Sequence, residues 1–571
     1  MTEVIPLLIY AVLRQPAAST RPSTPPQVIA AIGRLCSTAS NHHAGQFVAY
    51  RYSYRRMKYL TYAGNNITSA RLPEGAEIFY APDSIPGIKK PRVPEAITNA
   101  FRNPLGMPPP GELVNRRSRI LIAFDDNCQP FPQTARPDIR QQALEVLLPL
   151  LYSYGVRKKN IRLVCAVALH RKMTKHELAR MVGPKIMRQF YPQQLANFDA
   201  EDRDDIADLG QTEEGEPVQV CKGVVQSDLV IYVDTVQIPL NGGHKSVAVG
   251  LGTYESIANH HAPKMTADTP HVMQPEDSQM HDCIERLSRV IQKHARIMVM
   301  EAAMNNATYP FHVRYLGKPN RRCNLLERFL KTATPAAMAL TPEPIRKAIL
   351  GSVRSVYDPI EINACTIDTV HPRTLQAMKD QLTVSAPGQY DTMVFGLPDL
   401  SPYAVGARIN PVLVVSDVLG YVFNWFYNKP LIKRGGVVII LNPVFEIFHK
   451  DYHVAYKKFY EEVLPVTADP FEMQEKFQER FARDPHLIDC YRRGYAHHGF
   501  HPFTVWYWAT YALKYLSAVI LVGPDNDSAA RKLGVQWARS LDHALGQAGE
   551  LTGGHDVVAL TVPPFFYCNV A

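Results

Sequence analysis

The sequence lacks the features of membrane proteins, disulfide-rich secreted proteins and common zinc enzymes. No uninterrupted apolar segment reaches the ~20 residues that a membrane-spanning helix needs. Its nine cysteines contain no CxxC pair and no regular spacing, a pattern typical of reduced thiols in a cytosolic protein. The HExxH zinc motif is also absent. These absences favour a cytoplasmic protein that neither binds nor spans a membrane.

Widespread phosphate-binding and hydrolase motifs are missing as well. The sequence contains no GxxxxGK[ST] loop, no GxGxxG fingerprint and no GxSxG elbow, which leaves the P-loop, dinucleotide-binding and serine hydrolase classes unsupported. A formal net charge of +9 is modest for 571 residues, and the Lys and Arg residues are scattered. This balance suits an anionic small molecule and does not indicate a nucleic-acid partner.

The sequence does contain a repeated alternation of apolar runs and amphipathic segments. From residue 119 onward, RILIAFDD, NIRLVCAVALH and SDLVIYVDTV read as buried strands, separated by helical patterns at 138–155 and 174–190. Thr174 and Glu177 have the spacing of a capping box at the start of the second helix. Strand–helix–strand order predicts an α/β fold with mainly parallel sheets.

The length suggests two domains. We predict a loose N-terminal extension at 1–56, because much of it is rich in Pro, Ser, Thr and Ala. A first α/β domain follows at 57–290, and a second at 291–571 contains the further strand-like runs YDTMVFGL, KRGGVVIILNP and LSAVILVGP. The last segment is a candidate to cross back to the first domain.

Polar residues follow each of the first three predicted strands. These are FDDNCQP after the first, LHRKMT after the second and QIPLNGGHKS after the third. In open α/β sheets, ligands bind beyond the carboxyl ends of the strands. We therefore expect the three segments to meet in one crevice.

The NGGHKS segment combines flexibility with an amine. Gly242 and Gly243 can adopt positive φ and bring backbone N–H groups close to an anion, beside Lys245. A tight turn with an exposed lysine is the simpler reading of this segment alone.

Several histidines are candidates for chemistry. His170 ends a predicted strand, where it could act as a general base or be merely an exposed or helix-capping residue. His260 and His261 follow a short helical pattern, and adjacent helical residues point in different directions, so at most one is expected to bind a given metal.

Two other segments have plain structural readings. YAHHGFHPFTVWYW contains Trp506 and Trp508, which could stack on a flat cofactor ring but are more often core residues. The acidic run DAEDRDDIADLG reads as a solvated loop rather than as a divalent-cation site.

Taken together, these segments resemble the nickel-dependent lactate racemase family. The resemblance is clearest in VALHRKMTKHEL, in the GGxKS turn and in the following YESIANH, and extends more weakly over most of residues 57 to 565. It implies two α/β domains with an active-site cleft between them. It also implies a nickel-pincer nucleotide of the pyridinium-3,5-dithiocarboxylic acid mononucleotide type, in which Ni(II) is bound in a plane. Soft sulfur donors in a planar arrangement suit that ion.

Matching the motifs residue by residue assigns roles that the resemblance implies. Lys245 would be joined to the cofactor, and His260 would be the nickel ligand. His170 would take the proton of the substrate hydroxyl while hydride leaves the adjacent carbon. Asp126 would lie on the cofactor and substrate side of the cleft, and Gly242, Gly243 and Trp506 are further candidates for cofactor contacts.

The sequence departs from the family where the family binds substrate. The arginine of its DxTRP segment is here Gln129, and the second catalytic histidine is replaced within Thr235, Val236 and Gln237. Loss of a guanidinium that pairs with a carboxylate makes lactate itself a poor candidate. His244 is a remote candidate for the second base, and Gln129, Arg171 and Arg408 are candidates for substrate contacts.

We therefore expect a racemase or epimerase that acts on a hydroxylated small molecule and depends on cofactor-synthesis proteins for maturation. Two alternatives stay open. One is a one-sided redox or elimination reaction with the same cofactor, and the other is an inactive nucleotide-binding homologue. The sequence leaves the oligomeric state open.

Overall fold

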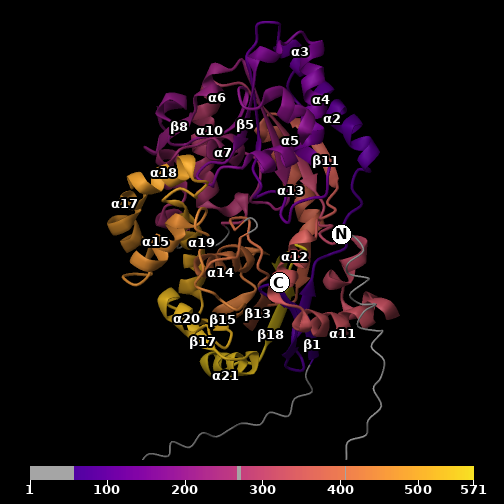
Figure 1. Cartoon of the computed structure of the whole chain (residues 1–571), viewed down its shortest axis with the longest axis vertical. Helices are drawn as coiled ribbons and strands as arrows, with labels where there is room; N and C mark the ends of the chain where they lie inside the picture. Colours follow the sequence, from indigo (N-terminus) through magenta and orange to yellow (C-terminus); the bar gives the residue numbers. More distant parts are fainter. Residues whose placement is uncertain (1–56, 267–271, 405–406) are drawn as a thin grey trace, which may run out of the picture. The chain divides into compact units, whose positions relative to one another are not determined.

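The computed structural model describes residues 57–266, 272–404 and 407–571, so the predicted extension at 1–56 lies outside the described residues. The described residues all belong to one compact unit. Its two largest sheets lie in the upper and lower halves of Figure 1. The fold is α/β with mainly parallel sheets, as the alternation of apolar runs and helical patterns predicts.

The first sheet has six strands in the order β11-β10-β9-β4-β5-β6. They are β11 (Pro359–Cys365), β10 (Ile297–Met304), β9 (Leu229–Val236), β4 (Ile120–Asp125), β5 (Ile161–Ala166) and β6 (Leu195–Asn197). All pairs are parallel except β10 with β11. Strands β4, β9 and β10 are buried along their whole length, which explains why their sequences are continuous apolar runs rather than alternating ones.

The second sheet has the order β17-β16-β15-β13-β18-β3 and is parallel throughout. Its strands are β17 (Gln536–Ala538), β16 (Ala518–Val522), β15 (Ile432–Leu441), β13 (Tyr390–Gly396), β18 (Val557–Thr561) and β3 (Glu77–Tyr80). Along β15, Val437 and Ile439 pack with Ala544 in one core cluster, whereas Val438 and Ile440 belong to another. Both faces of this sheet are therefore covered.

Three small sheets complete the strands. They are the hairpin β1 (Met57–Ala63) with β2 (Asn66–Leu72), the hairpin β7 (Ile206–Gln211) with β8 (Pro217–Cys221), and the parallel set β12 (Thr383–Ala386), β19 (Tyr567–Val570) and β14 (Phe426–Tyr427).

The longer helices flank the sheets. In the half of the first sheet they are α2 (Val93–Arg102), α4 (Ile139–Ser153), α5 (Lys175–Phe190), α10 (Gln279–His294) and α13 (Ile367–Leu382). The others are α11 (Leu325–Leu340), α12 (Glu343–Ser352), α15 (Val454–Glu462), α18 (Pro485–Arg493), α19 (His501–Tyr515), α20 (Asp527–Leu533) and α21 (Leu541–Thr552). The predicted capping box is confirmed, because Thr174 Oγ1 accepts from the backbone N–H of Glu177 at the start of α5.

The sheets do not divide at residue 290, where we predicted the domain boundary. Strands β10 and β11 follow that boundary but belong to the first sheet, and β3 precedes it but belongs to the second. The chain thus crosses between the halves near its beginning, through β3. Its last strands, β18 and β19, pair with strands of the C-terminal half and with β3. Short apolar runs show that strands exist but not which sheet they join.

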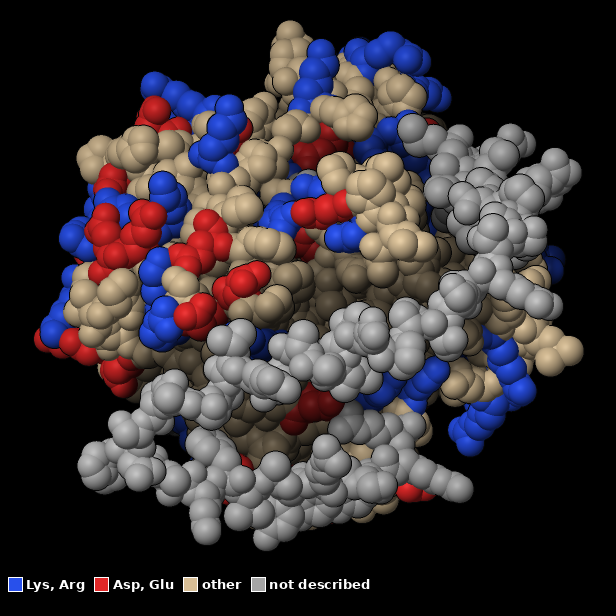
Figure 2. All heavy atoms as spheres, turned by 60° about the horizontal axis from the view of Figure 1, so that its bottom comes forward, with Lys and Arg blue, Asp and Glu red and all other residues tan. Residues whose placement is uncertain are grey.

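Charged side chains of both signs are interspersed on the face shown in Figure 2, as the scattered Lys and Arg residues of the sequence suggest. Among the residues described, none of the helices combines the length and hydropathy of a bilayer span. The eight cysteines in the same residues are all free thiols.

Candidate active site

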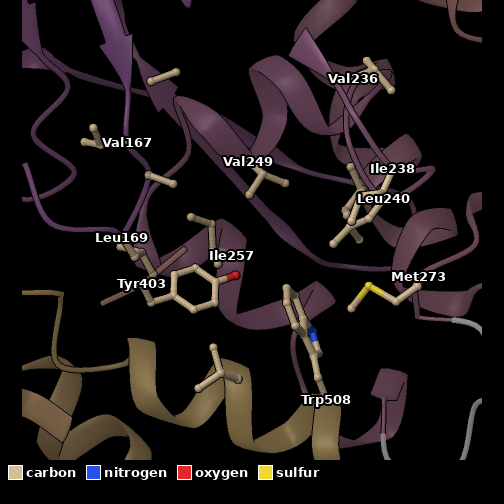
Figure 3. Close-up of a cluster of buried hydrophobic side chains, with 14 of the residues drawn as sticks. Val167, Leu169, Val236, Ile238, Leu240, Val249, Ile257, Met273, Tyr403 and Trp508 are labelled. Atoms are coloured by element: carbon tan, nitrogen blue, oxygen red, sulfur yellow. The ribbon is translucent and has the colours of Figure 1, made fainter. Parts of the chain in front are cut away.

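A cavity of about 200 Å³ lies at the carboxyl ends of β4, β5 and β9. The three polar segments that follow these strands all line it, as predicted. Its opposite wall comes from the C-terminal half. Figure 3 shows part of the apolar lining, with Leu169, Val249 and Ile257 from the first half near Tyr403 and Trp508 from the second.

Asp126 and His170 form a hydrogen-bonded pair in this cavity. Nδ1 of His170 lies 2.8 Å from Oδ2 of Asp126, and the backbone N–H of Cys128 donates to Oδ1 of the same carboxylate. Burial raises the pKa of Asp126, but the neighbouring imidazole and these hydrogen bonds outweigh burial and leave the pKa below its ordinary value. The carboxylate therefore orients the imidazole and leaves Nε2 to exchange a proton.

Lys245 extends into the same cavity from the first turn of α7 (Lys245–Gly250). Burial lowers the pKa of its amine to about 8, although the carboxyl groups of Asp234, Asp125 and Asp126 act in the opposite direction. The Nζ atom lies 5.9 Å from the ring centre of Trp508. A buried amine with a depressed pKa is partly neutral near physiological pH and can act as a nucleophile.

The two glycines before this helix have the positive φ angles that we predicted, +86° at Gly242 and +64° at Gly243. Their close neighbours, however, are protein groups. The N–H of Gly243 donates to Oε1 of Glu301 at 2.7 Å, and a Cβ at Gly243 would lie 2.4 Å from the His371 ring. Gly242 lines the cavity and Gly243 does not. The anion held by the N–H of Gly243 is thus a carboxylate of the protein itself.

The adjacent histidines differ in their surroundings. His260 ends α8 (Tyr254–His260), is fully buried and does not line the cavity, and neither ring nitrogen has a hydrogen-bond partner. His261 lines the cavity, and its ring stacks on Trp508 with centroids 5.3 Å apart. His260, to which sequence matching assigned the nickel, therefore does not line the cavity of Lys245, whereas the adjacent His261 does.

His261 has the features of a metal ligand. Its Nδ1 lies 3.2 Å from the carbonyl oxygen of Ile257, so donation of the Nδ1 proton leaves a lone pair on Nε2. Burial and the nearby Lys245 lower the pKa of His261 to about 3. The ring is thus neutral at physiological pH, as metal binding requires.

Of the two tryptophans of α19, too, the one that lines the cavity is not the one that we predicted. Trp506, the predicted cofactor contact, is fully buried away from the cavity and packs near Phe459, with centroids 6.0 Å apart. Trp508 lines the cavity. Residues i and i+2 of a helix lie on nearly opposite faces, and α19 is buried on most of its surface, so the sequence could not distinguish them.

Three further predicted site residues also do not line the cavity. His244 lies between Ser288 and Asp368, with nitrogen–oxygen distances of 3.0 and 3.3 Å. Arg171 forms an ion pair with Glu177 and stacks over Tyr452, and Arg408 forms an ion pair with Glu343 over Phe445. Both guanidinium groups are occupied by protein partners, so neither is a substrate contact in this structure.

The positions that replace the family's substrate and base residues remain in or beside the cavity. Gln129 lines it, and its buried Oε1 has no hydrogen-bond partner. Gln237 exchanges hydrogen bonds of 2.7 and 2.6 Å with the backbone of Phe131 and so holds the loop that carries Gln129. Thr235 is fully buried and does not line the cavity.

Several cavity residues were not predicted from the sequence. His501 begins α19, and its ring centre lies 5.1 Å from that of His170. Cys128 Sγ lies 3.4 Å from Nδ1 of His170. Tyr403 and Tyr421 share a hydrogen bond between their hydroxyl groups, and Asp417 lies in the same wall. The HHGFH spacing could have pointed to His501. No sequence pattern marks Cys128, Tyr403, Tyr421 or Asp417 as cavity residues.

Comparison with known proteins agrees with this geometry. Residues 64–273, which contain His170, Lys245 and His261, match the lactate racemase N-terminal domain family. Over this part the chain is similar to the lactate racemases. It is 25% identical over 171 residues to lactate racemase from Lactiplantibacillus plantarum and 23% identical over 175 residues to that from Thermoanaerobacterium thermosaccharolyticum. Each alignment covers 29% of this chain but only 38% of the relative.

The fold similarity to lactate racemase extends further than the sequence similarity. The structure of the lactate racemase apoprotein from T. thermosaccharolyticum superposes with a TM-score of 0.57 at 15% identity and covers 90% of this chain and 100% of that one. The C-terminal half, which supplies Asp417, Tyr403 and Trp508, thus shares the lactate racemase fold although it lies outside the matched domain family.

Proposed function

We propose that this protein is a racemase or epimerase that uses a nickel-pincer nucleotide to invert a hydroxyl-bearing carbon. The observation that carries the proposal is that Lys245, His170 and His261 line one buried cavity at the strand ends of a lactate racemase N-terminal domain. The first supplies a nucleophilic amine, the second a base and the third a neutral imidazole. Such a donor set fits a covalently tethered nickel cofactor.

Each of these residues has a defined task in this proposal. Lys245 holds the cofactor through its amine, and His261 rather than His260 offers Nε2 to the nickel. When bound, the nickel-pincer nucleotide supplies a group that accepts and returns hydride. His170, oriented by Asp126, takes the hydroxyl proton of the substrate and returns it after the carbon has changed configuration. The stacked Trp508 and the apolar side chains of Figure 3 exclude water from the reacting carbon.

The experiment is turnover of a panel of single-enantiomer substrates by protein produced together with cofactor-synthesis proteins. The panel contains 2-hydroxy acids, 2-hydroxy amides and polyols, each deuterated at the reacting carbon. Inversion that is lost in His170→Ala, while nickel content is unchanged, supports the proposal. The matched control is His244→Ala, because this histidine lies outside the cavity.

The same panel separates the alternatives. Accumulation of an oxidised or dehydrated product without inversion indicates a one-sided redox or elimination reaction. Absence of turnover in fully nickel-loaded protein across the panel contradicts an enzymatic function and favours an inactive nucleotide-binding homologue.

A further inference from the structure

Asp417 is a buried carboxyl group that faces the cavity without a hydrogen-bond partner. It begins the π-helical turn η7 (Asp417–Tyr421), which continues α14 (Pro411–Ser416), and it is 7% exposed. Neither Oδ1 nor Oδ2 has a partner of good hydrogen-bond geometry among the described residues, although the Ser401 hydroxyl lies close enough to lower the pKa of the carboxyl group. π-helical turns occur often at functional sites. A buried carboxyl group without a partner is costly to folding, which points to a partner that the protein itself does not supply.

The other three carboxyl groups of the cavity already have protein partners. Asp125 accepts hydrogen bonds from the hydroxyl of Tyr232 and the backbone N–H of Thr235, at 3.1 and 2.7 Å. Asp126 is held by His170, and Asp234 accepts from the hydroxyl of Ser246. Asp417 is therefore the carboxyl group in the described lining that is left for a ligand.

The cavity offers little to a substrate carboxylate. No arginine is among the described residues that line it, and Lys245 is the single lysine there. In the proposed function that amine holds the cofactor. A bound carboxylate would then be buried without a free cation to pair with it and close to the charged carboxylate of Asp126, which disfavours its binding.

The unpaired polar atoms of the lining instead suit an uncharged group. Gln129 Oε1 is a free acceptor, and the indole N–H groups of Trp425 and Trp508 are free donors. Burial raises the pKa of Asp417 to about 8, although the nearby Ser401 hydroxyl lowers it in part. Near neutral pH its carboxyl group is thus mostly protonated and carries one donor and one acceptor.

We propose that Asp417 is a specificity-determining residue that binds the uncharged amide or hydroxyl group next to the reacting carbon and excludes 2-hydroxy carboxylates. This inference rests on the proposed function for the reacting carbon but concerns the other end of the substrate. It assigns the substrate to the class of 2-hydroxy amides and vicinal diols.

The test compares lactamide with lactate, because these probes have nearly the same size and differ in charge. Their dissociation constants are measured by ligand-observed NMR at about pH 6.5, where Asp417 is protonated. The protein carries Lys245→Met, because without the cofactor the amine of the wild type is mostly charged at this pH and would pair with lactate. This protein is expected to bind lactamide at least about 10-fold more tightly than lactate. Equal affinity, tighter binding of lactate, or no binding of lactamide would overturn the proposal.

Variants locate the effect at Asp417. Asp417→Ala should weaken lactamide binding by about 10-fold and leave lactate binding little changed, whereas Asp417→Asn should keep the preference. Asp417→Lys should reverse the preference, so that lactate binds more tightly than lactamide. If this variant does not fold, the result for Asp417→Ala decides whether Asp417 sets the preference. The matched control is Asp399→Asn, since Asp399 lies in the same half but outside the cavity. An unchanged preference in folded Asp417→Ala would refute the assignment.

The binding readout needs neither turnover nor nickel. Failure of the protein to load nickel would therefore contradict the proposed function without changing the measured preference. Loss of the preference in nickel-loaded, active protein would contradict this inference alone.

Discussion

The amine of Lys245 should titrate far below an ordinary lysine in protein prepared without the cofactor. Burial in the cavity lowers its pKa to about 8. At about pH 7.5, about a quarter of the amine would then be neutral, compared with about 0.1% of a lysine with the usual pKa. The fraction able to attack an electrophile rises by about 200-fold, which is the reactivity that covalent attachment of a cofactor requires.

The assay is brief labelling with acetic anhydride across a pH series, followed by mass spectrometry of the peptide that contains Lys245. Lys457 serves as the internal reference, because its side chain is 59% exposed. The cavity slows access of the reagent by a constant factor, so the midpoint of the labelling profile is the quantity to compare. We expect a midpoint near pH 8 for Lys245, about two units below the ordinary pKa of a lysine.

A midpoint above about pH 10 for Lys245 would refute the reasoning, because it would show that the amine is solvated or firmly ion paired. Lys245→Arg identifies the labelled peptide, since arginine is not acylated under these conditions.

Three further predictions concern stability and catalysis. Because the pKa of Asp417 is raised in the folded protein, its contribution to stability is fully present below about pH 4 and is lost as the pH rises towards about 8. The free energy of unfolding of Asp417→Asn, measured with urea, should therefore rise relative to that of the wild type by at most ~1.4 kcal/mol per pH unit in that window. A constant difference from pH 4 to pH 8 would contradict this assignment. Gln237→Ala removes two hydrogen bonds to the Phe131 backbone and should lower the free energy of unfolding by about 2 kcal/mol, whereas a loss below about 0.5 kcal/mol would show that the loop is held otherwise. Asp126→Asn should reduce turnover by about 100-fold without loss of nickel, because His170 loses the carboxylate that orients it; unchanged turnover would remove Asp126 from the proposed base.

The sequence predicted those parts of the site that depend on local pattern. Continuous apolar runs identified β4, β5 and β9, and the carboxyl ends of parallel strands meet at one edge, so the three segments that carry Asp126, His170 and Lys245 were expected together. The positive φ angles in the glycine turn followed from residue type.

The sequence could not show which of two neighbouring residues faces the cavity. His260 and His261 differ by about 100° around a helix axis, so the orientation of α8 decides which one faces the cavity. Trp506 and Trp508 pose the same problem in a helix with no polar face.

Long-range contacts explain the remaining errors. Arg171 and Arg408 read as free cations in the sequence, but each meets an acidic partner in the folded chain. Asp417 was missed because it follows the apolar segment PVLVVS, and only the folded chain places it in the cavity wall.

The most direct test of the proposed cofactor site is nickel content by elemental mass spectrometry, after production with cofactor-synthesis proteins. His261→Ala and His260→Ala are compared with the wild type as a matched pair of neighbouring, buried imidazoles. The proposed site predicts near-stoichiometric nickel in the wild type and in His260→Ala, and a loss in His261→Ala. Nickel that is retained in folded His261→Ala, or that is absent from the wild type, would contradict it.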